Sequence, residues 1–233
     1  MRRPLSGVDE SDLRREWRFL QLTLFIAAWM LLSPLIPDRW LVQVFLQAFL
    51  LNSVLVTLWA NPQWRGARRV AIALWCVSLA GSLLALLPLP DRWLRWSRLA
   101  AEASLLPLLA MLAAGILGFI FRGKRLTIDG ILATVAVYLL IALIFAQLYV
   151  LAIAVNPSSF SLPIPAVERT PHLLQIDMLY FSLVTLATVG YGDILPHTEF
   201  ARMLAMLEAV VGQFYVAVIV AVFVGMYAAQ SRD

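Results

Sequence analysis

The stretch that decides the fold is residues 188–193, which read Thr-Val-Gly-Tyr-Gly-Asp. Its glycines, Gly190 and Gly192, stand at alternate positions, and glycine adopts backbone conformations that other residues avoid. An extended stretch with this freedom can turn successive carbonyl oxygens to one side. Rings of carbonyls supplied by several chains can then replace the water shell of a cation, and the Thr188 hydroxyl can add one further ring. The stretch therefore predicts an oxygen-lined path for a hard, redox-inactive cation.

The composition around this stretch is that of a membrane protein. Of the 233 residues, 62% are hydrophobic and 14% are charged, whereas soluble globular proteins carry about 25% charged residues. A soluble domain of this length could not bury so much apolar surface. The single cysteine, Cys76, excludes an intramolecular disulfide. The net charge of +4 comes from arginines next to apolar runs, which indicates a membrane boundary and not a nucleic-acid-binding surface.

Six apolar runs are long enough for a transmembrane helix, which takes about 20 residues. They are residues 19–36, 40–60, 70–89, 99–121, 131–155 and 203–229. Residues 173–189 are only moderately apolar and end in the glycine-rich stretch, so we expect them to form a re-entrant segment. Within this segment the pattern predicts a short helix over residues 178–187, capped by Asp177. The predicted fold is an all-α membrane protein with six transmembrane helices and a re-entrant helix and filter between the fifth and sixth.

The chain divides into four segments. They are a cytoplasmic amphipathic N-terminal segment (1–18), a peripheral four-helix bundle that is voltage-sensor-like but weakly charged (19–121), a cytoplasmic linker (122–130) and a pore domain (131–229). Most of the 18 Lys and Arg residues fall on the side of the N-terminus, which predicts that both termini are cytoplasmic. We expect a multi-pass protein of a prokaryotic plasma membrane.

Residues 180–193 (YFSLVTLATVGYGD) closely resemble the pore helix and selectivity filter of potassium channels. Gly212 falls where that family has its inner-helix hinge glycine, and the similarity extends over residues 131–229. The resemblance implies a homotetramer with one central pore in contact with membrane lipids. It implies passive, selective conduction of K⁺ as the permeant ion, with no cofactor, no enzymatic activity, no small-molecule substrate and no nucleic acid.

The resemblance also implies a role for individual residues. The oxygens that coordinate K⁺ would come from Thr188, Val189, Gly190 and Tyr191, and Gly192 would allow the turn at the outer mouth. Support for the filter would come from Asp193, Tyr180, Phe181, Thr185 and Glu208. Asp193 would interact with Tyr180 or Phe181 behind the filter. At position 181, Phe replaces the Trp that is commoner in the family. The inner helix would provide gating and cavity-lining residues on one helical face: Gly212, Gln213, Val216, Val220 and Val224.

Glu208 lies inside the sixth run, where an acidic residue costs about 2.5 to 3.5 kcal/mol on insertion scales. One interpretation is a hydrogen bond to Thr185 or to the rear of the filter, with an effect on gating. The other is an interfacial glutamate paired with Arg202. The sequence leaves both open.

Arg92, Arg95 and Arg98 recur at every third position, which is the spacing of a voltage-sensing helix. The first three runs contain no Asp or Glu to balance them, and the arginines precede the fourth run. Contact with lipid phosphate therefore explains them better. We expect Glu102 to pair with Arg98 at the i+4 position.

Two other functions match parts of the sequence. Residues 190–193 also match the Gly-x-Gly-Asp pattern of intramembrane aspartyl proteases, which require a second carboxylate, here Asp129 or Asp177. The chain also matches a non-conducting or modulatory subunit that assembles with other channel chains. The stimulus is open, because voltage, lipid, tension and protons acting on His172 or His197 all remain compatible with the sequence.

Overall fold

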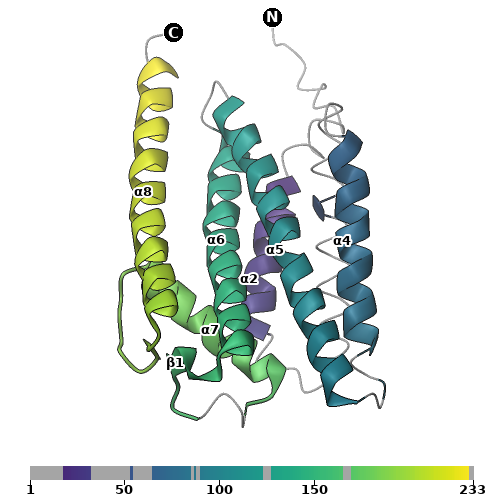
Figure 1. The fold of residues 1–233 in the computed structure, drawn as a ribbon. Helices are drawn as coiled ribbons and strands as arrows, with labels where there is room; N and C mark the ends of the chain where they lie inside the picture. The colour runs from purple at the N-terminus through teal and green to yellow at the C-terminus, as the bar shows by residue number, and fades with distance from the viewer. Residues whose placement is uncertain are drawn as a thin grey trace, which may run out of the picture.

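The computed structural model describes residues 18–32, 53–54, 65–84, 87, 90–122, 127–164 and 169–230. These ranges are almost entirely helical, and the long helices lie side by side (Figure 1). The helices are α2 (Arg18–Leu32), α4 (Arg65–Leu84), α5 (Asp91–Arg122), α6 (Ile128–Val155), α7 (Pro171–Leu186) and α8 (Glu199–Gln230). The shorter α7 lies at one end of the molecule and packs on both α6 and α8.

Four stretches within the described residues are long and apolar enough to cross a membrane. They are Gly66–Leu84, Arg92–Arg122, Ile128–Val155 and Glu199–Ala228. These stretches correspond to the third to sixth predicted runs, and a shorter apolar helix over Leu20–Met30 lies in the first. The second run, 40–60, falls almost wholly outside the described residues, as does the N-terminal segment. The count of six spans therefore stays a prediction.

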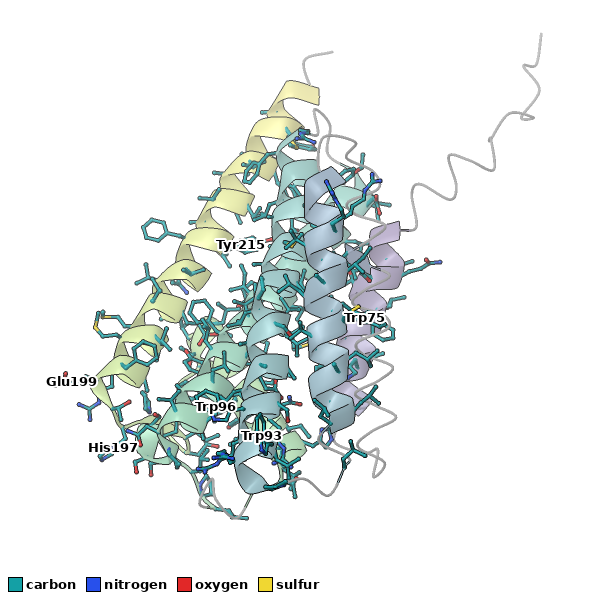
Figure 2. The ribbon with its side chains drawn as sticks, turned by 45° about the vertical axis from the view of Figure 1, so that its right-hand side comes forward. Trp75, Trp93, Trp96, His197, Glu199 and Tyr215 are labelled. Carbon is teal, nitrogen blue, oxygen red and sulfur yellow. The ribbon has the colours of Figure 1, made fainter. Side chains whose placement is uncertain are left out.

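Helix α5 is longer than the apolar run that predicts it. It begins at Asp91, directly after Pro90, whose carbonyl accepts the N–H groups of Trp93 and Leu94 at 2.9 and 3.2 Å. Pro107 lies inside α5 and the helix continues through it. Arg92, Arg95 and Arg98 consequently occupy the first turns of a continuous helix. Trp93 and Trp96 lie at the same end of the molecule as His197 and Glu199 (Figure 2).

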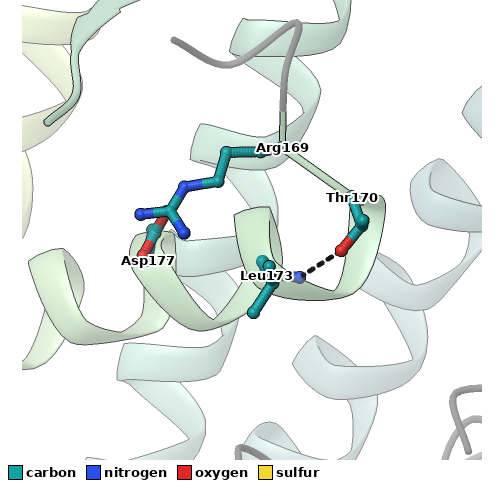
Figure 3. Close-up of polar contacts among 4 residues, drawn as sticks. All are labelled: Arg169, Thr170, Leu173 and Asp177. Atoms are coloured by element: carbon teal, nitrogen blue, oxygen red, sulfur yellow. Dashed lines mark hydrogen bonds and ion pairs between the residues drawn. The ribbon is translucent and has the colours of Figure 1, made fainter. Parts of the chain in front are cut away.

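Helix α7 begins seven residues earlier than predicted. Thr170 caps it by accepting the N–H of Leu173 at 3.4 Å, and Pro171 takes the first helical position, where a missing N–H costs nothing. Asp177 is therefore not the cap. It lies nearly two turns into the helix and pairs with Arg169 at 3.0 Å between Oδ2 and Nε (Figure 3). The pKa of Asp177 is raised because burial outweighs the nearby guanidinium.

Buried aromatic rings join α6 and α7 near the end of α6. The ring of Tyr149 meets those of Phe160 and Phe181 edge to face, at centroid distances of 5.2 and 5.1 Å. Phe160 begins the short strand β1 (Phe160–Ser161), which pairs antiparallel with β2 (Leu195–Pro196). This pairing ties the segment after α6 to the segment that follows residues 188–193.

Away from this cluster, α5 and α6 share a second core. Leu108, Leu112 and Ile116 of α5 and Leu140 of α6 are fully buried in it. Helix α4 packs on α5 and α2 packs on α6. The helices before the linker therefore lie against the α6–α8 segment of the same chain.

Candidate functional site

The stretch 188–193 leaves directly from the C-terminal end of α7. The N–H of Thr188 donates to Thr185 O at 2.9 Å, and the N–H of Val189 donates to Val184 O at 2.8 Å. These bonds satisfy carbonyls that a helix end leaves without partners. The start of the stretch is thus held by the last turn of α7, and the negative end of the α7 dipole lies beside it.

Along this stretch, residues with a positive φ angle alternate with residues without one. Thr188, Gly190 and Gly192 have φ angles of 56°, 62° and 80°, while Val189 and Tyr191 between them are not in that region. Alternation of this kind aligns neighbouring peptide dipoles on one side of the chain. Thr188 is the single non-glycine among the described residues with a positive φ, a conformation that costs about 1–3 kcal/mol and is typical of functional sites.

Tyr180 braces the stretch by two contacts. Its hydroxyl donates to Asp193 Oδ2 at 2.9 Å, and its ring stacks on that of Tyr191 with a centroid distance of 6.3 Å and an interplanar angle of 4°. The bond to the carboxylate raises the pKa of Tyr180, because it stabilises the protonated phenol. Phe181 packs instead against Tyr149 and Phe160.

Glu208 is fully buried where α6, α7 and α8 meet. One carboxyl oxygen accepts from the hydroxyl of Tyr149 at 2.5 Å, and the other is hydrogen-bonded to Ser182 Oγ. The pairing with Arg202 was wrong, and the expected hydrogen bond toward the helix that precedes residues 188–193 is present, with Ser182 as the partner in place of Thr185. Thr185 does not bind it, and Arg202 instead donates from Nε to Pro196 O at 3.3 Å.

The reason for this pairing is the register between α7 and α8. A Cβ at Gly212 would lie 2.8 Å from the carbonyl oxygen of Leu186, so the two helices touch there. Glu208 lies four residues before Gly212, and Ser182 lies four residues before Leu186. One turn back along both helices therefore brings Glu208 opposite Ser182. No pattern in the sequence states this register, although a polar Tyr and Ser at membrane depth are a signal for a buried polar partner.

The remaining predicted residues of α8 lie on a face that its own chain leaves open. Gln213, Val216, Val220 and Val224 are all exposed. Gly212 is buried against α7, and its role as a hinge stays a prediction.

The arginines of α5 also lie at the surface. Arg92, Arg95 and Arg98 are exposed. The expected pair between Arg98 and Glu102 was wrong, because Glu102 turns toward α6 and α7 and accepts from Nε2 of Gln147 and of Gln175.

The carboxylates that a protease would use have other partners. Asp193 accepts from Tyr180, and Asp177 pairs with Arg169. Asp129 lies in the first turn of α6. The 28 residues of this helix are about 40 Å long, so Asp129 is about that far from the other end of α6, which leads to β1. These positions give no support to two carboxylates that share a proton. Within the described ranges, no cluster of three or more His, Cys, Asp or Glu could hold a metal ion.

Comparison with known proteins agrees with this geometry. Residues 135–229 match the sequence model of the family described as "Ion channel". Protein LctB of Bacillus caldotenax is 39% identical over 97 residues, which are 41% of this chain and 71% of LctB. Protein LctB of Geobacillus stearothermophilus is 36% identical over 97 residues, which are again 41% of this chain and 71% of that protein. The chain therefore belongs to this ion channel family, which confirms the expected class, a membrane protein for ion transport. The match covers most of α6, all of α7, the stretch 188–193 and most of α8.

Proposed function

We propose that this chain is the subunit of a potassium-selective channel that conducts K⁺ passively through a pore formed by four copies. The observation that carries the proposal is the alternating backbone of residues 188–192 at the C-terminal end of α7. The oxygens that coordinate K⁺ come from Thr188, Val189, Gly190 and Tyr191, and Gly192 makes the outer turn. K⁺ is the permeant ion, and conduction needs no cofactor.

The chemistry of the stretch suits K⁺. Backbone carbonyls replace the hydration shell of a K⁺ ion when several rings of them follow one another along a pore. The C-terminal end of a half-membrane helix adds a favourable negative potential. Irregular backbone at membrane depth is tolerated where it lines a water path or is buried in protein. Asp193, Tyr180 and Thr185 support the filter from behind.

The exposed surfaces support assembly from several copies. Tyr191 is 70% exposed and Val189 52% exposed in the single chain. Along Glu199–Ala228 of α8 the buried residues are few: Ala201, Glu208, Gly212 and Ile219. One chain supplies carbonyls to one side of an ion only, so a complete ring requires copies around an axis. Four copies with α8 innermost would cover these surfaces with protein, and lipid would cover the outer helices.

In this assembly the exposed face of α8 lines the path below the filter. Gln213 and Val216 would face the cavity, and Val220 with Val224 would form a ring that closes the pore by dewetting. Gly212 would act as the hinge. The proposal also includes the rest of the chain. The helices before α6 form a peripheral bundle, the chain spans a prokaryotic plasma membrane six times, and both termini are cytoplasmic.

Ion flux through the purified protein in liposomes tests this function. We expect flux with K⁺ as the permeant ion, block by Ba²⁺ and little flux with Na⁺. Gly190→Asp should abolish K⁺ flux, because a side chain at positive φ disrupts the carbonyl ring. Gly66→Asp is the matched control, since Gly66 is exposed in the first turn of α4 with no atom within 4 Å of an added Cβ.

Other outcomes of this experiment overturn parts of the proposal. Equal K⁺ and Na⁺ flux would contradict selectivity. An intact assembly without flux at any membrane potential would indicate a non-conducting subunit.

A further inference from the structure

The buried carboxyl of Glu208 has two hydroxyl partners on two other helices. Tyr149 of α6 donates to Oε2, and Ser182 of α7 lies at hydrogen-bonding distance from Oε1. No described basic side chain pairs with Glu208. An ionised carboxylate without a cation is costly to bury at this depth. The surroundings therefore favour a neutral carboxyl.

A count of hydrogens points the same way. Ser182 Oγ lies 2.8 Å from the carbonyl oxygen of Ala142 and also contacts Glu208 Oε1. A serine hydroxyl has one hydrogen to donate, and a backbone carbonyl can only accept. If Ser182 donates to Ala142, the hydrogen between Ser182 and Glu208 belongs to Glu208. With a protonated Oε1, all the groups in the cluster are satisfied; with a carboxylate, Ser182 faces two acceptors with one hydrogen.

Other titratable and charged side chains on the helices around Glu208 have partners of their own. The proton on the Glu208 carboxyl is therefore the one whose gain or loss changes this cluster. On α6, Tyr149 binds Glu208 directly, and the ring of Tyr138 packs against that of Tyr215 of α8. On α7, Tyr180 is bound to Asp193 and Asp177 to Arg169. On α8 itself, Arg202 donates to Pro196 O.

We propose that Glu208, in its protonated form, is a positioning residue for the filter. It donates to Ser182 and accepts from Tyr149, so it joins α7 to α6 and α8 one turn before the contact between Gly212 and Leu186. That turn of α7 leads directly into Thr188. Loss of the proton leaves Ser182 with one hydrogen for two acceptors, so either its bond to Glu208 or its bond to Ala142 O is lost. The consequence for conduction rests on the proposed function; the protonation state does not.

Infrared spectroscopy of the full chain in liposomes tests the protonation state without any ion flux. The difference between wild type and Glu208→Gln should contain the C=O stretch of a protonated carboxyl at neutral pH. Glu199→Gln is the matched control on the same helix, because Glu199 is exposed in its first turn. Its difference spectrum should contain carboxylate bands alone. A carboxylate band for Glu208 at neutral pH would overturn the proposal.

Flux measurements test the positioning role. Glu208→Gln supplies an amide donor and a carbonyl acceptor, so K⁺ flux should stay near wild type and become independent of pH. Wild-type flux should fall as the pH rises and the proton is lost. Glu208→Ala leaves Ser182 and Tyr149 without their partner and should lower flux at least about tenfold.

The results separate the two proposals. Loss of flux in Glu208→Gln comparable to that in Glu208→Ala would overturn the positioning role, and the Gln variant remains informative if the Ala variant does not fold. A protonated band in a wild-type protein that conducts no K⁺ supports the protonated Glu208 and overturns only the proposed function.

Discussion

At the scale of single residues, Tyr180 holds the stretch 188–193 through a hydrogen bond and a ring contact. The bond to Asp193 fixes the end of the stretch, and stacking on Tyr191 fixes its middle. These contacts oppose the strain of Thr188, whose positive φ is unfavourable for a β-branched residue. The backbone of the stretch 188–193 is thus held from the side of α7 by the side chain of Tyr180.

Tyr180→Phe isolates the hydrogen bond, because Phe keeps the ring that stacks on Tyr191. We expect K⁺ flux to fall severalfold and K⁺ over Na⁺ selectivity to weaken, since a hydrogen bond to a charged group contributes about 1.5–3 kcal/mol. Liposome flux with each ion measures both effects. Tyr227→Phe, on an exposed part of α8, is the control. Selectivity equal to wild type in Tyr180→Phe would show that the bond is dispensable.

At the scale of elements, polar contacts connect helices that are distant in sequence. Glu102 of α5 meets Gln147 of α6 and Gln175 of α7, so the helix that carries the arginines touches the helix that leads into the stretch 188–193. Such contacts between membrane helices contribute about 0.6–2 kcal/mol each. The α7–α8 contact at Gly212 relies instead on the absence of a side chain.

Gly212→Ala tests this close approach. An added Cβ would lie 2.8 Å from both the carbonyl oxygen and Cδ1 of Leu186. Overpacking of this kind destabilises a protein by about 1–3 kcal/mol. We therefore expect a lower midpoint of thermal unfolding in detergent.

Gly225→Ala on the same helix is the control for Gly212→Ala, because an added Cβ at Gly225 meets no atom within 4 Å. It should leave the midpoint unchanged or raise it slightly, since Ala favours a helix over Gly. Equal effects of the two substitutions would argue that α8 does not press on Leu186.

At the scale of the whole molecule, one side of the chain remains uncovered. The stretch 188–193 and the face of α8 with Val220 are exposed, while α4 packs on α5 and α5 packs on α6 on the other side. In the proposed assembly, further copies cover this open side, and a closed ring gives every copy the same contacts.

A cysteine at Val220 of α8 tests the proposed ring. In a Cys76→Ser background, Val220→Cys should form oxidised dimers within the assembly, because the proposed arrangement of four copies would bring these positions together around the axis. Ile72→Cys, exposed on α4, should not, since it lies on the outer side. Electrophoresis after mild oxidation measures the outcome. Cross-linking at Ile72 but not at Val220 would contradict a ring with α8 innermost.

Much of the fold could be predicted, because the signals are local. The apolar runs 70–89, 99–121, 131–155 and 203–229 each overlap most of a described helix, and hydropathy alone detects such helices. The boundaries were less accurate. Helix α7 begins at Pro171 because Thr170 caps it, and Asp177, which also has the chemistry of a cap, pairs with Arg169 instead.

The sequence by itself determined that this protein is a membrane ion channel with its glycine-rich stretch after a short helix, since composition and a contiguous motif carry that information. Only the tertiary structure decided which side chains meet: Glu208 with Tyr149 and Ser182, and Glu102 with Gln147 and Gln175. The physical reason is that helix partners depend on the rotation and register of one helix against another. Those quantities arise from packing over the whole molecule, such as the approach of Gly212 to Leu186.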